Sequence, residues 1–360
     1  MKQTKVIIIS GFLGAGKTSL MVSAADQLRA KGWKVACITN DQGEQLVDTK
    51  IVYSNGFPIQ QVQGGCFCCK FDNLVDTINH IVNHNETDVI FAEAVGSCTD
   101  IMATVIKPLE AFHGELLDIQ PLTVVVDPQR FRDIKKENSI YTTEIAYLFE
   151  KQIEEAQYLL LNKADVNEKM EIEEIKNQLD NIIPFAKIFP TSAVNAMGVN
   201  EWLDNIFDSN DLNATVLDID YDVYAKAEEQ LGWLNSSISV SGLQIDVLEF
   251  ANELLNKWLE KLEQRGAVVA HLKIWVEDEN RHLKLSSVRN NEIYPLNDIK
   301  HGIWLSDKVD IWINARINID YQMLKIILEE IKLEYKTLDI IVNQLDNFAP
   351  SRPVPTHRFV

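Results

Sequence analysis

The sequence predicts an α/β protein in which a parallel sheet, covered by helices on both faces, is followed by a smaller α+β domain. The first observation is that residues 5–10 form a short apolar run that leads into a glycine-rich loop and a helical stretch. Strands that are apolar on both sides are typical of parallel sheets buried on both faces. The second observation is that strand-like and helix-like stretches alternate as far as about residue 207, and the third is that the pattern changes beyond it.

The elements expected in the first domain follow one another in alternation. After the strand over residues 5–10, apolar spacing predicts a helix over residues 18–30, and Gly32 suits its C-terminal end. A second helix is expected over residues 73–82, where one side is apolar. Further strands are expected at residues 34–39, 88–92, 122–126, 158–161 and 187–189. Their alternation with helices predicts one parallel sheet.

A different pattern follows the acidic, loop-like residues 208–222. Residues 246–266 and 321–333 have the apolar spacing of amphipathic helices. Residues 267–277 and 311–319 alternate between apolar and polar positions, which is typical of antiparallel strands with one buried face. We therefore expect a first domain at residues 1–207, a boundary segment at 208–235, an α+β domain at 236–348 and an extended, proline-containing tail at 349–360.

Length and composition limit the function. The chain has 360 residues, enough for two domains, and a net charge of −19, which argues against a broad nucleic-acid surface because phosphate backbones need clustered lysine and arginine. No apolar stretch approaches the roughly 18–20 residues of a membrane span. Five cysteines, three of them packed together, do not fit a secreted disulfide framework. We therefore expect a cytoplasmic protein that binds neither nucleic acid nor membrane.

The loop after the first strand reads GFLGAGKT over residues 11–18, which is the pattern of a phosphate-binding loop. Its glycines permit a tight turn whose amide hydrogens point at phosphate oxygens, Lys17 adds a charge for the β and γ phosphates, and the Thr18 hydroxyl is placed for Mg²⁺. A chance glycine turn is the alternative, but the strand before the loop and the helix after it favour the fold of a P-loop NTPase. The nucleotide-binding residues expected here are Gly11, Gly14, Ala15, Gly16, Lys17, Thr18 and Ser19.

The letters NKAD at residues 162–165 predict which base is bound. A carboxylate such as that of Asp165 accepts two hydrogen bonds, from N1 and the exocyclic amine of guanine, and adenine offers neither donor there. Asn162 would bridge to the phosphate-binding loop or to the base, and the stem of Lys163 would lie on the face of the base. A helix N-cap at Asp165 is the alternative, but the position after a strand favours GTP.

Acidic residues follow two further strands. Glu93 ends an apolar strand and is a candidate Mg²⁺ ligand, directly or through water, and Gly96 then offers an amide to the γ-phosphate. Asp41 and Glu44 follow an earlier strand and are candidates for Mg²⁺, for positioning water or for a transported metal. For each single acid the alternative is a solvated loop or a helix cap. The catalytic candidates are therefore Lys17, Asp41 and Glu93.

Three cysteines stand close together at Cys66, Cys68 and Cys69, directly after two glycines. Thiolates are natural ligands of Zn²⁺, Co²⁺ and Cu⁺. Three thiols need a fourth ligand from elsewhere or leave an open position, and an open position suits transfer of the ion. The alternative is that these residues are small apolar residues of the core.

The two remaining cysteines have different expected roles. Cys37 lies within an expected strand and fits the core. Cys98 follows Glu93 and Gly96, where a segment that senses the γ-phosphate would move. We hypothesise that Cys98 approaches the three-cysteine cluster in one nucleotide state.

Several motifs together resemble those of the CobW-type GTPases, P-loop proteins related to the GTPases that insert nickel into hydrogenase and urease. GFLGAGKT, GGCFCC, AEAVG, VVVDPQRF and NKAD occur in the order expected of that family, and the resemblance covers about residues 4–205. It implies a metallochaperone role in which a cysteine motif binds Zn²⁺ or Co²⁺ near GTP and Mg²⁺. By position it implies phosphate and Mg²⁺ ligands at residues 11–19, a Walker B acid at Glu93, metal ligands at Cys66, Cys68 and Cys69, and a guanine reader at residues 162–165.

The chain also departs from that family in two places. After Glu93 the family usually has a stretch of small residues and proline, where this chain has SCTD at residues 97–100. The C-terminal half has no histidine-rich insert and no good match to the usual closing strand motif. A divergent subgroup with its own client is the expected consequence.

The leading interpretation is a GTP-hydrolysing metallochaperone in which the nucleotide state governs binding and delivery of a thiolate-bound ion. Hydrolysis is expected to be slow alone and faster with metal or partner, and the partner would be a client metalloenzyme or corrinoid protein. A regulatory GTPase with redox-sensing thiols and a P-loop biosynthetic kinase or ligase with structural cysteines stay open as alternatives. The oligomeric state stays open too, with a homodimer among the alternatives.

Overall fold

The computed structural model describes residues 3–43, 47–137, 139–208, 215–290, 292–294 and 303–359. The chain divides into two units. Unit 1 comprises Met1–Gln42, Asp48–Ala227 and Arg352–Val360, and unit 2 comprises Gly43–Val47 and Glu228–Ser351. Of the boundary segment expected at residues 208–235, residues 209–214 lie outside the described part of the chain. The last residues of the chain therefore belong to unit 1, together with the N-terminal half.

Unit 1 is built on an eight-stranded sheet with the order β3-β2-β4-β1-β6-β7-β8, and β5 also pairs with β1. Every one of these pairings is parallel. At the centre of the sheet, Val6, Ile7, Ile8 and Ile9 are all 0% exposed, as expected for a strand covered on both faces. The strands are β1 (Thr4–Ser10), β2 (Val35–Asn40), β3 (Ile59–Val62), β4 (Val89–Glu93), β5 (Leu117–Ile119), β6 (Thr123–Val126), β7 (Tyr158–Leu161) and β8 (Lys187–Pro190).

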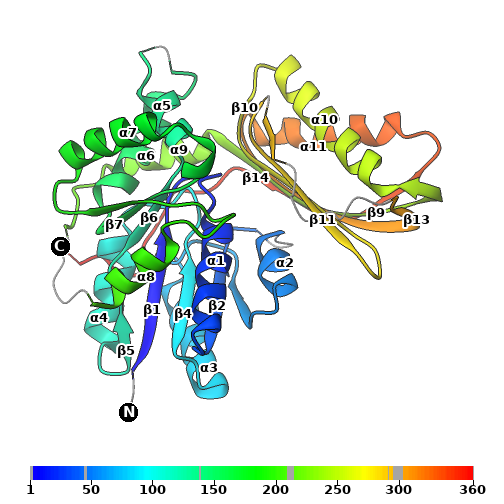
Figure 1. Ribbon diagram of the computed structural model, residues 1–360. Helices are drawn as coiled ribbons and strands as arrows, with labels where there is room; N and C mark the ends of the chain where they lie inside the picture. The colour runs from blue at the N-terminus through cyan, green and yellow to red at the C-terminus, as the bar shows by residue number, and fades with distance from the viewer. Residues whose placement is uncertain are drawn as a thin grey trace. The chain divides into compact units, whose positions relative to one another are not determined.

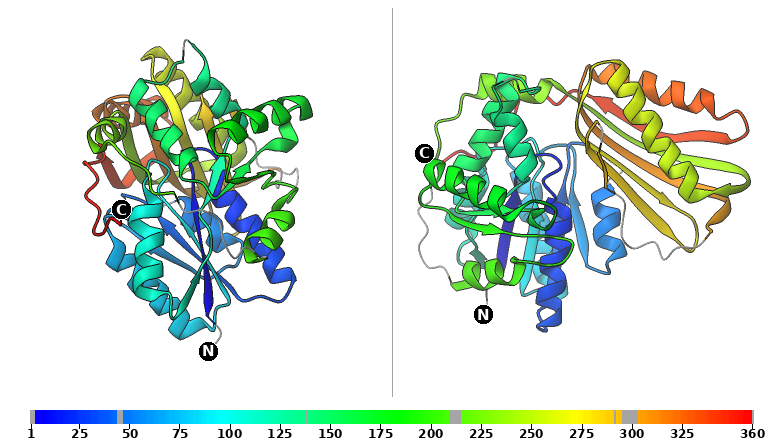
Figure 2. Two further views of the ribbon diagram at one scale, coloured as in Figure 1. Left: turned by 90° about the vertical axis from the view of Figure 1, so that its left-hand side faces the viewer. Right: turned by 45° about the horizontal axis from the view of Figure 1, so that its top comes forward.

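Helices lie on both sides of this sheet (Figures 1 and 2), which confirms the α/β architecture expected from the sequence. A π-helical turn at Met102–Ile106 leads into α4. The helices that alternate with the strands are α1 (Lys17–Ala30), α2 (Val47–Ser54), α3 (Phe71–Asn85), α4 (Lys107–His113), α5 (Pro128–Lys135), α6 (Thr143–Glu154), α7 (Lys169–Ile182), α8 (Val199–Asp208) and α9 (Tyr221–Glu229).

The motif residues of unit 1 follow the carboxyl ends of neighbouring parallel strands. The glycine loop follows β1, Asn40 ends β2, Glu93 ends β4 and Asn162 follows β7. Glu93 is in register with Ile9 of β1 and with Thr39 of β2, so these strand ends lie at one edge of the sheet. Ligand sites of open α/β sheets lie at this edge because the loops that leave the strands there converge.

Unit 2 contains an antiparallel sheet with the order β12-β11-β10-β13-β9-β14. Helices α10 (Val247–Gln264) and α11 (Tyr321–Glu334) pack on one face, as Figure 1 shows, and enclose a core with the apolar side chains of the strands. The α+β character of the C-terminal half is thereby confirmed. The strands are β9 (Leu231–Asp246), β10 (Val268–Glu277), β11 (His282–Arg289), β12 (Glu292–Tyr294), β13 (Leu305–Asn318) and β14 (Asp339–Phe348).

No helix among the described residues is both long enough and apolar enough to span a lipid bilayer.

Candidate nucleotide and thiol sites

The phosphate-binding loop has a backbone that only glycine can adopt at its key positions. Gly11, Gly14 and Gly16 have φ angles of 129°, 78° and 94°. A Cβ on Gly11 would lie 2.2 Å from the Val125 carbonyl oxygen, and one on Gly16 would lie 2.4 Å from the Asn162 amide nitrogen. The loop is therefore pressed against β6 and against the start of the NKAD segment, with no room for side chains.

Lys17 stands at the start of α1, in the centre of that loop. Its side chain is buried, and its Nζ donates hydrogen bonds to the carbonyls of Gly11 at 2.8 Å and Phe12 at 3.3 Å. The positive end of α1 adds to the charge of the ammonium, so the loop offers amides, a cation and a helix dipole to an anion. Ala15 and Ser19, also expected at the nucleotide, lie in the loop and in the first turn of α1.

Three oxygen-bearing side chains meet beside the loop. The Thr18 hydroxyl lies 2.6 Å from Asp48 Oδ1 and 3.1 Å from Glu93 Oε1. A hydroxyl and two carboxylates form the hard oxygen set that Mg²⁺ prefers, so these residues fit that ion. Thr18 and Glu93 were expected here from the sequence, whereas Asp48, in the first turn of α2, was not, because it belongs to no motif.

Of the other two acids expected near the nucleotide, Asp41 lies at the same edge of the sheet and Glu44 cannot be placed. Asp41 is buried directly after β2, where its backbone N–H donates to the Val62 carbonyl at 3.3 Å. Glu44 lies outside the described residues. Gly96 lies beside the loop, because a Cβ on it would be 3.0 Å from Lys17 Nζ and 2.8 Å from Leu13 Cδ2.

The NKAD segment braces the phosphate-binding loop from the other side. Asn162 donates from Nδ2 to the Ala15 carbonyl at 2.9 Å and accepts at Oδ1 from the Ala193 amide at 3.1 Å. Lys163 Nζ donates to the buried Asp127 at 2.7 Å, an acid that the sequence analysis did not single out. The carboxylate of Asp165 is exposed, and this leaves it accessible to a base.

The three cysteines of the GGCFCC motif bring their sulfurs together. Cys66 Sγ lies 2.8 Å from Cys68 Sγ and 3.3 Å from Cys69 Sγ, and the sulfurs of the neighbours Cys68 and Cys69 are 3.8 Å apart. All three residues are free thiols. Sulfurs bound about 2.3 Å from a tetrahedral zinc ion would lie about 3.8 Å apart, so this cluster, called the thiol cluster below, has nearly the dimensions of such a site. No other group of three or more histidine, cysteine or acidic ligands close enough to share an ion occurs among the described residues.

Asn40 at the end of β2 holds the backbone of the thiol cluster. Its Nδ2 donates to the carbonyls of Val62 at 2.9 Å and Gly65 at 2.7 Å, and its Oδ1 accepts from the Phe67 amide at 2.9 Å. Gly64 takes a φ of 73° and so lets the chain turn before the cysteines. The sequence analysis did not give Asn40 this role, since its partners are backbone groups that no motif reveals.

The thiols share their protons unequally. Hydrogen bonding with Cys68, in the first place, and with Cys69 and Cys98 lowers the pKa of Cys66 well below that of a free thiol. The hydrogen bond to Cys66 raises the pKa of Cys69 to about 11. The position just before α3 adds the positive end of a helix. Cys37, by contrast, is a core residue of β2 whose pKa burial raises to about 12.

Cys98 lies at the thiol cluster. It is fully buried, and its side chain contributes to lowering the pKa of Cys66 and to raising that of Cys68. Cys98 belongs to the segment 93–98, in which Gly96 lies next to Lys17. Gln152 holds this segment, because its Nε2 donates to the carbonyls of Gly96 at 3.0 Å and Cys98 at 2.7 Å. Residues 93–98 thus run from Glu93, which contacts the Thr18 hydroxyl, to Cys98, which lies near the thiol cluster.

Glu155 anchors the continuation of that segment. Its carboxylate accepts from the Thr99 hydroxyl at 3.2 Å and from the Met102 amide at 3.2 Å. The side chain is buried, and desolvation, aided by the charge of Asp100, outweighs these hydrogen bonds and raises the pKa of Glu155 to about 8.

The raised pKa of Glu155 predicts a pH dependence of stability. Unfolded, the carboxyl loses its proton near pH 4.5; folded, it keeps the proton to about pH 8. The folded state therefore binds more protons between these values, and the free energy of unfolding falls as pH rises through that window. As pH rises from 5 to 8.5, we expect the free energy of unfolding of Glu155→Gln to increase by about 3 kcal/mol relative to that of the wild type. Urea unfolding at each pH measures this difference.

The matched control for that measurement is Glu150→Gln, which removes a part-exposed carboxylate from the neighbouring helix α6. The raised pKa of Glu155 would be contradicted if the control gained stability over the wild type with pH in the same way. It would also be contradicted if Glu155→Gln showed no such gain.

The C-terminal residues of unit 1 run across the thiol cluster. The Val354 amide donates to Cys69 Sγ at 3.3 Å, and the Thr356 amide donates to the Cys68 carbonyl at 2.8 Å. Arg358 Nε donates to Asp100 Oδ2 at 2.7 Å, directly beyond Cys98. The end of the chain is thereby tied both to the three-cysteine motif and to the segment that follows β4.

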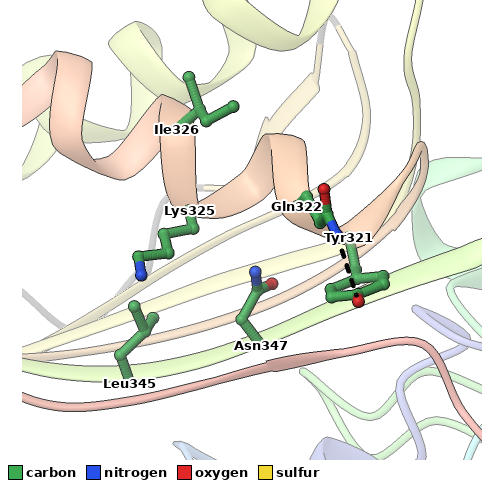
Figure 3. A pocket seen from close by; sticks show the side chains of 6 residues that line it. All are labelled: Tyr321, Gln322, Lys325, Ile326, Leu345 and Asn347. Carbon is green, nitrogen blue, oxygen red and sulfur yellow. Dashed lines mark hydrogen bonds between the residues drawn. The ribbon is translucent and has the colours of Figure 1, made fainter.

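A hollow in unit 2 has a lining that differs chemically from the nucleotide and thiol sites. Figure 3 shows its lining by α11 and β14, with the side chains of Tyr321, Gln322, Lys325, Ile326, Leu345 and Asn347. It contains no thiol, no acid and none of the predicted site residues, so it carries none of the chemistry considered above.

Known proteins give the same picture of the N-terminal half. Residues 5–190 match the family described as CobW/HypB/UreG, nucleotide-binding domain. Zinc-regulated GTPase metalloprotein activator 1 of Dictyostelium discoideum is 24% identical over 260 residues, 64% of this chain and 51% of that protein. Zinc chaperone YjiA of Escherichia coli (strain K12) is 33% identical over 101 residues, 28% of this chain and 31% of that protein.

A third relative, zinc chaperone CobW of Pseudomonas aeruginosa, is 28% identical over 211 residues, 50% of this chain and 54% of that protein. The matches thus span about half the length of these relatives or less. The family match itself covers more than half of the chain and includes the phosphate-binding loop, the thiol cluster and the NKAD segment. The chain belongs to the CobW/HypB/UreG family of nucleotide-binding domains.

Proposed function

We propose that the protein is a GTP-hydrolysing metallochaperone that holds a zinc ion at Cys66, Cys68 and Cys69 and delivers it to a client metalloenzyme. The observation that carries this proposal is the segment 93–98, whose Glu93 side chain contacts the Thr18 hydroxyl, whose Gly96 lies beside Lys17 and whose Cys98 lies near the thiol cluster. A change at the γ-phosphate would reach the metal site through this short segment and its non-covalent contact with the thiol cluster. Zinc is favoured over cobalt because relatives are named zinc chaperones.

The chemistry at the nucleotide site follows from the residues present. Loop amides, Lys17 and the amide of Gly96 would hold the β and γ phosphates and stabilise the charge that develops during hydrolysis. Thr18, Asp48 and Glu93 would hold Mg²⁺, which when bound supplies a further positive charge to the same oxygens. Asp41, buried at the same sheet edge, is the candidate for orienting the attacking water.

The chemistry at the thiol cluster explains how nucleotide and cargo would be coupled. If residues 93–98 became disordered or shifted between nucleotide states, the surroundings of the bound ion would change. Reciprocity then requires that zinc change the affinity for nucleotide. Turnover would be slow alone and faster with zinc or client.

The test is a zinc titration by calorimetry of protein loaded with a GTP analogue, with GDP or with no nucleotide. We expect the zinc affinity to differ between the loaded states and to be lost in the Cys66→Ala/Cys68→Ala/Cys69→Ala variant. Phosphate release from GTP, followed with and without zinc, supplies the converse measurement. Equal zinc affinity in every nucleotide state, with phosphate release unaffected by zinc, would overturn the proposal.

Base selection supplies a separate prediction. Asp165→Asn replaces an acceptor by a donor and is expected to weaken GTP binding by about 10²–10⁴-fold, because two hydrogen bonds to a charged acceptor are lost. Xanthosine triphosphate has an oxygen where guanine has its amine, so the variant should bind it correspondingly more tightly than the wild type does. Fluorescence competition with the two nucleotides measures the ratio.

Asp180→Asn, an exposed acid on α7, is the control for that exchange. An unaltered ratio of the two affinities in Asp165→Asn would show that Asp165 does not contact the base.

A further inference from the structure

The motif VVVDPQRF at residues 124–131 has no role in either of the sites described above. Its acid, Asp127, binds the ammonium of Lys163 in the NKAD segment, with Nζ 2.7 Å from Oδ2. We propose that Asp127 is a positioning residue for guanine, which holds the Lys163 side chain as a platform for the base and keeps its ammonium from Asp165. This inference rests on the guanine binding of the proposed function and does not depend on its metal site.

Asp127 can anchor Lys163 because Asp127 is itself held in one place. Its side chain is only 3% exposed, and Oδ1 caps α5 by accepting from the Gln129 amide at 2.9 Å, while Oδ2 accepts from Lys163. The capping hydrogen bond restricts the side chain to one orientation, and Pro128 at the start of α5 restricts the backbone. The acceptor of the ammonium therefore has a fixed position.

Lys163 is held at its backbone as well as at its ammonium. Its φ of 60° lies in the left-handed region, which few residues other than glycine adopt. The residues on either side keep it there, since Asn162 donates to the Ala15 carbonyl at 2.9 Å and Ala164 donates to the Thr191 carbonyl at 3.0 Å. With both ends fixed, the methylene groups of Lys163 are an ordered apolar surface directly beside the phosphate-binding loop, and such a surface suits the face of a purine.

The two acids that Lys163 could bind differ in burial. Asp127 is buried, whereas Asp165, two residues from Lys163 in the chain, is exposed. A buried charge needs a partner more than a solvated one does, so the ammonium pairs with Asp127. Asp165 thereby keeps its charge for N1 and the exocyclic amine of guanine. If Asp127 lost its charge, the ammonium would turn to Asp165 and compete there with the base.

The test separates binding of the base from binding of the phosphates. Asp127→Asn keeps the oxygen that caps α5 and removes the charge opposite Lys163. We expect its affinity for GDP, measured by competition with a fluorescent guanine nucleotide, to fall by about 10-fold, the scale of one hydrogen bond between charged groups. Its affinity for inorganic tripolyphosphate, which has no base, should match that of the wild type.

Two further variants make the result specific. Lys163→Met keeps a long apolar side chain without the ammonium and should show the same loss for GDP alone. In the double variant, Asp127→Asn should have little effect beyond that of Lys163→Met, because the two residues act as one unit. Asp133→Asn is the matched control, since it removes another acid of α5 that pairs with a lysine, Lys136 at 2.8 Å, and it should bind GDP as the wild type does.

The inference is overturned if Asp127→Asn loses tripolyphosphate and GDP affinity equally, because the phosphate-binding loop would then be at fault. Additive effects of the two exchanges would also overturn it. If Asp127→Asn fails to fold in thermal unfolding, Lys163→Met alone decides, and GDP affinity like that of the wild type contradicts the inference. Zinc affinity that ignores the nucleotide in the wild type overturns the metallochaperone but leaves the role of Asp127 intact.

Discussion

Replacing Lys17 with alanine is expected to lower the rate of GTP hydrolysis by about 10²–10³-fold, the usual cost of removing one preorganised donor from a transition state. The ammonium is buried in the loop and donates to the Gly11 and Phe12 carbonyls, which hold it in place there. Nucleotide affinity should fall as well, because the same charge faces the β and γ phosphates. Phosphate release under single-turnover conditions measures the effect.

Lys34→Ala is the control for that variant, because Lys34 is an exposed lysine paired with Glu86 at 2.6 Å. The interpretation of the loop fails if the two variants hydrolyse GTP at similar rates while both bind it.

The second large effect is expected at the thiol cluster, where Cys66→Ala should weaken zinc binding by more than about 100-fold, beyond the cost of disturbing outer partners. The sulfur of Cys66 is hydrogen-bonded to both neighbours, at 2.8 Å from Cys68 and 3.3 Å from Cys69. Its loss removes one of the three sulfur ligands, and the one whose pKa is lowered. Competition with a chromophoric chelator gives the affinity.

Cys37→Ala reports the effect of losing an unrelated buried thiol. Zinc binding by Cys66→Ala that matches the wild type would mean that the cluster is not the cargo site.

The local parts of the nucleotide site could be predicted from the sequence because their chemistry depends on neighbours along the chain. The glycine loop between a buried strand and a helix fixes where Lys17 and Thr18 lie, whatever the remainder of the fold does. Asp48 could not be predicted in the same way. It reaches Thr18 only because α2 folds back against the sheet edge, and its neighbourhood in sequence contains other acids that look equally suitable.

Long-range contacts were also beyond the sequence in unit 2. The strand β9 was not expected, because its central residues include Asn235, Ser236, Ser237 and Ser239, which hide the alternation of apolar positions. Its partners β13 and β14 hold it in place through backbone hydrogen bonds, which residue identity hardly records. The helix α10 was easier, since an apolar stripe over eighteen residues is a local signal.

The thiol cluster could be predicted from the sequence in part. Adjacent cysteines raised the question whether Cys68 and Cys69 could face one ion, and a turn pinned by Asn40 brings their sulfurs to 3.8 Å. The expected approach of Cys98 depended on the fold of the sheet edge. The proline-containing tail was expected to be extended, but its contacts with Cys68 and Cys69 could not be predicted from the sequence.

The contacts of the tail have a practical meaning for any acceptor of the ion. The amide of Val354 already occupies one side of the Cys69 sulfur, and Thr356 is hydrogen-bonded to the backbone of Cys68. A recipient's ligands can approach from that side only by displacing the molecule's own terminus. In the proposed function, residues 354–356 would therefore compete with an acceptor that approaches from that side, and their sequence would help to decide how readily the ion is transferred.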